Sequence, residues 1–174
     1  MWLKTILPVV LLTGCTSVVP ATLARLNNFS PLTVDPAALQ AAVTVPDGVS
    51  VPVGGATMLL EATRSDTNET LSQTFVLDQT ETGDLLVFEV ADEDIAAFRT
   101  LQRKVRTWEE IAKDETTGSF GVDVTLCKVG DGPAEDATFS VFVQADDGGL
   151  MPILRDAPVS EVIGSGAFDG EGCA

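Results

Sequence analysis

Apolar and polar residues alternate with a period of two along most of the chain after residue 40, a pattern typical of half-buried β-strands. In the segment 56–64, for example, Met58, Leu60 and Ala62 fall on one face and the residues between them on the other. Turn residues separate each alternating segment from the next. The pattern predicts seven short strands, at 41–45, 56–64, 71–79, 85–90, 118–129, 138–145 and 150–154.

Three details of this pattern constrain the sheet. The segment 85–90 is apolar at nearly every position, so we expect it to be covered on both faces. The turn sequence Asp131-Gly132-Pro133 lies between 118–129 and 138–145, which predicts that these two strands pair as a hairpin. Pro152 has no backbone N–H to give to a neighbour, so the last strand is expected at an edge.

The segment 92–113 has the period of an α-helix instead. Its apolar residues recur at spacings of three and four and form one stripe, made of Phe98, Leu101, Val105, Trp108 and Ala112. Acidic residues at 92–94 and Lys113 at the other end match the direction of the helix dipole. We expect the stripe to pack on the sheet; docking against a partner helix is the alternative interpretation.

Together these elements predict a mainly β fold with one long amphipathic helix over about 92–113. Seven strands with regular turn signals are typical of a β-sandwich or an open barrel-like sheet. A length of 174 residues fits one hydrophobic core, so residues 31–174 are expected to form a single β-rich domain.

Composition limits the functions that this domain can have. The chain has 26 Asp and Glu residues against 10 Lys and Arg, a formal net charge of −16. That charge argues against binding of nucleic acid and against electrostatic docking on anionic lipid, since both are polyanions. The chain contains no histidine, which excludes catalytic triads and metal ligands based on imidazole.

Four of the basic residues fall within eight positions of the predicted helix: Arg99, Arg103, Lys104 and Arg106. We expect them on its exposed side. The alternative is a local cationic spot that meets an acidic partner or anionic headgroups.

The first residues of the chain have the features of an export signal. Lys4 precedes an apolar run from Ile6 to Leu12, which is much shorter than the roughly 20 residues of a membrane-spanning helix. The run ends in Leu12-Thr13-Gly14-Cys15, which resembles the lipobox of bacterial lipoproteins. An ordinary secretory signal followed by a cysteine, or a cytosolic protein with an apolar start, are the alternatives.

The resemblance implies a specific division of the chain. Residues 1–14 would be a cleaved signal peptide, Cys15 the lipidated N-terminus, and 15–30 the lipidated segment and tether. The protein would then face the periplasm from a lipid anchor without crossing the membrane, and Thr16 in place of Asp favours the outer membrane. The remaining sequence is similar in overall pattern to small envelope lipoproteins of Gram-negative bacteria, and no motif links it to a family of known activity.

Lipidation of Cys15 would leave two other cysteines, Cys127 and Cys173, in an oxidising compartment where disulfides form. We therefore expect a disulfide between them, which would hold the C-terminal tail against a strand. Two separate thiols are the alternative.

The sequence offers no assembled set of catalytic or metal-binding residues. Asp-Gly fragments at 131–132, 146–149 and 169–172 lack the alternating ligands of a calcium loop. There is no nucleophile elbow, phosphate-binding loop or dinucleotide fingerprint. We expect no cofactor, no metal and no enzyme activity.

Two binding roles remain, and a hydrolase without histidine is a more distant third. The first is interaction with another protein of the cell envelope, through binding or as a structural component. The second is carriage of an apolar ligand or lipid, for which we expect a cavity lined by five apolar residues: Leu85, Val87, Phe98, Leu101 and Trp108.

Overall fold

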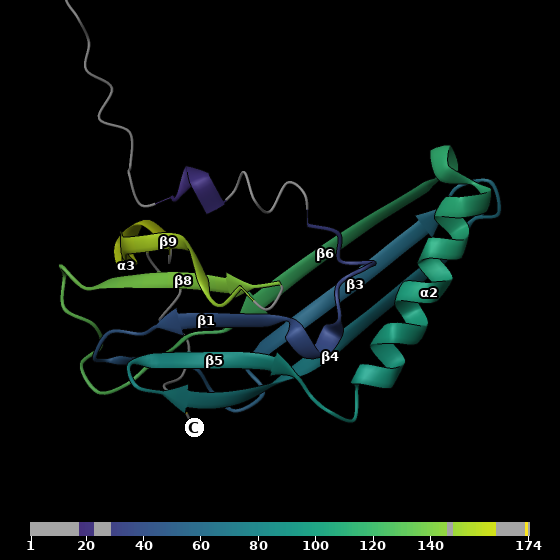
Figure 1. Cartoon of the computed structure of the whole chain (residues 1–174). Helices are drawn as coiled ribbons and strands as arrows, with labels where there is room; N and C mark the ends of the chain where they lie inside the picture. Colours follow the sequence, from purple (N-terminus) through teal and green to yellow (C-terminus); the bar gives the residue numbers. More distant parts are fainter. Residues whose placement is uncertain (1–17, 23–28, 146–147, 163–172, 174) are drawn as a thin grey trace, which may run out of the picture.

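The computed structural model describes residues 18–22, 29–145, 148–162 and 173, and it confirms the mainly β fold. Seven strands form one curled antiparallel sheet with the order β6-β3-β4-β5-β1-β8-β9, an open half-barrel (Figure 1). Its strands are β1 (Gln40–Thr44), β3 (Ala56–Arg64), β4 (Glu69–Thr82), β5 (Leu85–Val90), β6 (Thr116–Val124), β8 (Thr138–Gln144) and β9 (Met151–Pro158). The open barrel-like form is therefore the correct one of the two expected architectures.

Shorter elements complete the described structure. The strands β2 (Val49–Ser50) and β7 (Cys127–Lys128) form a separate two-stranded sheet. The 3-10 helices η1 (Pro36–Ala38) and η2 (Lys113–Glu115) precede β1 and β6, and the short helix α3 (Val159–Val162) follows β9.

The long strand β4 joins the two halves of the sheet. Its first half pairs with β3, from Glu69 to Val76, and its second half pairs with β5, from Leu77 to Thr82. The strands β6, β3 and β4 consequently slant away from β1, β5, β8 and β9 (Figure 1). This change of direction gives the half-barrel two regions on its concave face.

The helix α2 (Ile95–Ile111) covers the first region. It confirms the predicted helix, although it begins three residues later and ends two residues earlier than 92–113. Residues 92–94 form a turn, and Asp94 stands at the N-cap without a side-chain hydrogen bond. The predicted stripe is buried at Phe98, Leu101, Val105 and Trp108, and the ring of Phe98 lies 5.0 Å from that of Phe75 on β4.

The concave face supplies the rest of the core. Met58, Leu60 and Ala62 on β3 are almost completely buried, as their alternation predicts. Val87 and Phe88 point to opposite faces of β5 and are both buried, which confirms that this strand is covered on both sides.

The expected hairpin between 118–129 and 138–145 is wrong. β6 pairs with β3, whereas β8 pairs with β1 and β9. The predicted strand 118–129 is interrupted after Val124, and its last residues form β7 against β2 instead. The turn at 129–132 does form, with the Gly132 N–H donating to the Val129 carbonyl, but it follows β7 and packs against the loop at Gly48.

Gly48 shows how close this loop contact is. Its φ is +84°, and a Cβ atom there would lie 2.2 Å from the carbonyl oxygen of Gly132. Only glycine fits such an approach without moving the backbone. The contact fixes the loop that connects β6 to β8 and so replaces the local hairpin that the sequence suggests.

The predicted edge position of the last strand is confirmed, since β9 is the outermost strand on its side of the sheet. Residues 18–22 also contact the domain at this edge, ahead of the expected start at residue 31. Val18 forms an antiparallel bridge with Leu154, and Thr22 is buried.

A buried polar residue holds the segment before η1 against the helix. The side-chain nitrogen of Gln102 donates to the carbonyl oxygens of Pro31 and Val34, at 2.8 and 2.9 Å. Phe29 extends the contact, because its ring lies 5.8 Å from that of Phe120 on β6.

Candidate functional site

The second region of the concave face contains an apolar cavity of about 610 Å³. It lies between the strands near the two open edges of the half-barrel, with β6 on one side and β8 and β9 on the other. Cavities of roughly 300–1,000 Å³ are typical of sites for small molecules. The described residues that line it are Ala41, Val43, Thr44, Val45, Pro46, Val49, Val122, Val124, Thr125, Leu126, Phe139, Val141, Val143, Ile153 and Val159.

The alternation of the strands explains why this surface is apolar. Ala41 pairs with Val143 and Val43 pairs with Val141, so these four side chains share the concave face of β1 and β8. Val122 pairs with Met58, which places it on the same face of β6. The period of two thus continues the hydrophobic core beyond the region that α2 covers.

The chemistry of the lining favours an uncharged ligand. None of the described lining residues carries a charge, and only Thr44 and Thr125 have polar side chains. The hydroxyl oxygen of Thr44 already accepts a hydrogen bond from the Ser140 N–H, at 2.8 Å. The described lining can therefore contact a hydrocarbon chain along most of that chain's length, and it contains no cation for a carboxylate or phosphate group.

The cavity that the sequence suggested is wrong in its lining. Phe98, Leu101 and Trp108 belong to the packed core beneath α2, and Leu85 and Val87 lie on the opposite face of the sheet. None of these five residues lines the apolar cavity. Sequence reasoning placed the cavity between sheet and helix because the helix supplies the longest apolar stripe, whereas the buried residues of that stripe pack into the core against the sheet.

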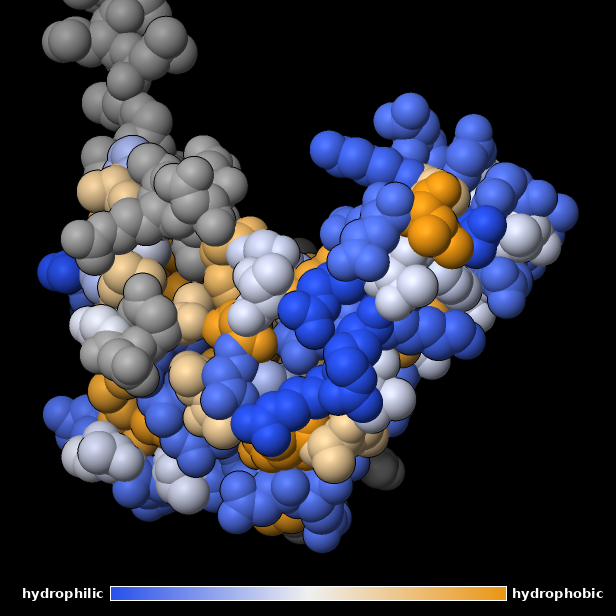
Figure 2. All heavy atoms as spheres, turned by 45° about the vertical axis from the view of Figure 1, so that its right-hand side comes forward, coloured by the Kyte–Doolittle hydropathy of each residue, from blue (hydrophilic) through white to orange (hydrophobic). Residues whose placement is uncertain are grey.

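The exposed face of α2 is polar, as expected. Arg99, Arg103, Lys104 and Arg106 are all exposed. Figure 2 shows hydrophilic residues running over the forward face of the molecule, and hydrophobic residues gathered in the hollow beside them. Arg99 forms an ion pair with Asp35 at 2.8 Å, and this hydrogen bond lowers the pKa of the Asp35 carboxyl group.

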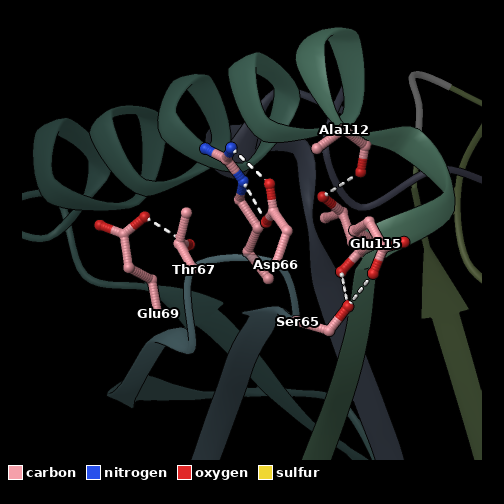
Figure 3. A network of polar contacts seen from close by, with 8 residues as sticks. Ser65, Asp66, Thr67, Glu69, Ala112 and Glu115 are labelled. Atoms are coloured by element: carbon pink, nitrogen blue, oxygen red, sulfur yellow. Dashed lines mark hydrogen bonds and ion pairs between the residues drawn. The ribbon is translucent and has the colours of Figure 1, made fainter.

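A polar network joins the end of α2 to the turn between β3 and β4 (Figure 3). Ser65 contacts both the carboxylate and the carbonyl oxygen of Glu115 in η2. Arg64 pairs with Asp66 at 2.7 Å, which lowers the pKa of Asp66 and raises that of Arg64. These contacts fix the β3–β4 turn and the chain that leaves the C-terminal end of α2, and none of their residues lines the cavity.

Cys127 and Cys173, which the sequence suggested as a pair, lie at disulfide-bonding distance, with their Cα atoms 5.2 Å apart. The Cys173 N–H also donates to the Lys128 carbonyl, at 3.3 Å. Cys127 follows the lining residue Leu126, and Val49 on the paired strand β2 also lines the cavity. The pair therefore lies at the end of the cavity that the small sheet closes. Cys15, the predicted lipidation site, lies outside the described residues.

Reduction of Cys127–Cys173 is expected to lower the free energy of unfolding by about 2–4 kcal/mol, because the bond restricts the unfolded chain over a separation of 46 residues. The measurement is urea unfolding, with and without reductant, of the Cys15→Ala protein produced without residues 1–14, in which Cys127 and Cys173 are the only two cysteines. In a Cys127→Ala/Cys173→Ala variant, reductant should change nothing. An unchanged unfolding midpoint in the Cys15→Ala protein would show that the two residues are not bonded.

In the described part of the chain, no helix is long and apolar enough to cross a membrane. The same residues contain no group of three or more His, Cys, Asp or Glu side chains arranged to hold a metal ion.

Comparison of the chain with protein-family models, with curated proteins and with solved structures finds no match. Its function is therefore inferred from its own residues and geometry.

Proposed function

We propose that this chain is a lipoprotein, anchored through lipidated Cys15 on the periplasmic side of a bacterial membrane, that binds an apolar ligand within its half-barrel. The observation that carries the proposal is the cavity of about 610 Å³ with no charged residue in its described lining. A continuous apolar surface of this kind is costly to leave in contact with water. The role is binding without catalysis.

The lining also indicates which class of ligand fits. An acyl chain or another neutral hydrocarbon suits walls of valine, leucine, isoleucine and phenylalanine side chains. An anionic headgroup would find no compensating cation in the described lining and would be repelled by a chain of formal net charge −16. The ligand's polar end is therefore expected outside the cavity.

The lipobox supports the location. Leu12-Thr13-Gly14-Cys15 follows a short apolar run, and two or more acyl chains give stable anchoring at a membrane surface. Thr16 after the cysteine favours the outer membrane.

Binding of an uncharged fluorescent probe of apolar sites, N-phenyl-1-naphthylamine, tests the proposal. In the Cys15→Ala protein produced without residues 1–14, which needs no detergent, we expect saturable binding and displacement by a neutral long-chain monoacylglycerol. Val122→Asp places a carboxylate at the cavity wall and should weaken binding at least tenfold, a loss of about 1.4 kcal/mol.

Val76→Asp is the matched control. Val76 and Val122 are 53% and 39% exposed, and they lie on opposite faces of the same sheet, so both variants should fold. Val76→Asp should bind the probe as the parent does. Equal binding by both variants, or no saturable binding by the parent, would contradict the proposal.

A second candidate role, as an adaptor to another envelope protein, is favoured by the strand β6. This strand of nine residues pairs only with β3 within the described structure, and most of its residues are exposed. Such an edge offers backbone donors and acceptors to an added strand. A stoichiometric envelope protein crosslinked to β6 would favour this role over ligand carriage.

A further inference from the structure

The start of the described chain lies beside the cavity. Val18 forms an antiparallel bridge with Leu154 on β9, and the Val19 N–H donates to the carbonyl oxygen of Ile153 at 3.0 Å. Ile153 is itself one of the residues that line the cavity. The turn that follows is also held, since the Thr22 N–H donates to the Val19 carbonyl and Thr22 is 5% exposed.

This attachment limits how far the lipid on Cys15 can lie from the cavity. Three peptide units separate Cys15 from Val18, and an extended chain spans at most roughly 3.6 Å per residue. The Cys15 Cα atom is therefore within about 11 Å of the Cα atom of Val18, which is fixed to the strand that carries Ile153. An acyl chain attached to Cys15 has the reach to enter the cavity.

The chemistry of the chain matches that of the lining. An acyl chain joined to Cys15 through a diacylglyceryl thioether is uncharged along its length, as the described lining requires. Its attachment to the same protein also gives it a high effective concentration at the cavity, of the order of millimolar for a short linker. A free lipid has to compete with this tethered chain.

Resting on the proposed function, we propose that the cavity is a site for one acyl chain of the protein's own lipidated Cys15. The tether between Cys15 and Val18 delivers the chain to the side of the cavity formed by β9. An acyl chain that moves from the bilayer into this cavity exchanges one apolar environment for another. One chain can therefore be held by the protein while the remaining acyl chains stay in the membrane.

Site-specific photo-crosslinking in the native membrane tests this inference. The photoreactive amino acid p-benzoylphenylalanine replaces Phe139, which lines the cavity, in the lipidated full-length protein. The matched control carries the same replacement at Phe142, on the same strand but outside the lining. After irradiation and proteolysis, mass spectrometry identifies what each position has captured.

We expect Phe139 to be linked to the N-terminal lipopeptide that contains Cys15, with at least tenfold less of this product from Phe142. A phospholipid adduct at Phe139 instead would overturn this inference and leave the proposed apolar site standing. Absence of any lipid adduct at Phe139, or equal adducts at both positions, would overturn the occupancy of the cavity by any acyl chain. The proposal for the tethered acyl chain and the proposal for an apolar site are therefore contradicted by different results.

Discussion

Cys15→Ala is expected to abolish incorporation of a clickable palmitate analogue into the protein in cells. The thiol of Cys15 is the proposed attachment point of the anchor, and alanine has no atom to which a diacylglyceryl group can be joined. When residues 1–14 are also replaced by an ordinary cleavable secretory signal, we expect the Cys15→Ala domain in the soluble fraction. Each lost acyl chain removes about 0.8 kcal/mol of membrane affinity per buried methylene, so the change in partition is very large.

The other two cysteines provide the control for this experiment. Cys127→Ala and Cys173→Ala should retain the palmitate label, because these residues are assigned to each other and not to lipid. Label retained in Cys15→Ala, or a membrane-bound domain after replacement of the signal, would contradict the lipid assignment.

Phe98→Ala is expected to lower the free energy of unfolding by about 3–5 kcal/mol. Phe98 is completely buried, and its ring packs on Phe75 where the first turn of α2 meets the sheet. Removal of the ring leaves a cavity that this close-packed contact cannot fill. The measurement is urea unfolding of the Cys15→Ala protein, with the slope against denaturant compared as well as the midpoint.

Ile111→Ala on the same helix is the appropriate comparison. Ile111 is 64% exposed, so its truncation should change stability by no more than about 0.5 kcal/mol. A loss below 1 kcal/mol for Phe98→Ala, or similar losses for both variants, would mean that α2 is not packed on the sheet as described.

Local patterns predicted the elements of this fold well. Alternation placed Met58, Leu60 and Ala62 on the buried face of β3, and the spacing of three and four found the buried side of α2. Pro152 correctly indicated an edge strand, because a missing N–H is a property of the residue itself. Each of these inferences depends only on a residue itself or on its neighbours in the sequence.

Pairing between distant segments could not be predicted in the same way. β8 pairs with β1, about 100 residues earlier, and the contact of Gly48 with Gly132 replaces the expected hairpin. The two-part pairing of β4 is likewise invisible in its own alternation. Non-local partners depend on how the whole sheet curls, and one sequence contains no direct signal for that.

The cavity could not be predicted from the sequence for the same reason, because distant segments form it. Val43, Val122 and Ile153 each look like ordinary core residues in a strand, and they face a void only because the two edges of the sheet stand apart. Gln102 was also missed, since a glutamine in an amphipathic helix gives no sign that it will bind the carbonyls of Pro31 and Val34. In contrast, the pairing of Cys127 with Cys173 was suggested by counting cysteines once Cys15 was assigned to lipid.

Whether the half-barrel holds an apolar ligand is measured most directly by the probe titration of the Cys15→Ala protein produced without residues 1–14. We expect saturable binding with one probe molecule per chain, displaced by a neutral monoacylglycerol and weakened at least tenfold by Val122→Asp but not by Val76→Asp. Binding that is absent, or that is unaffected by Val122→Asp, would contradict the proposed function.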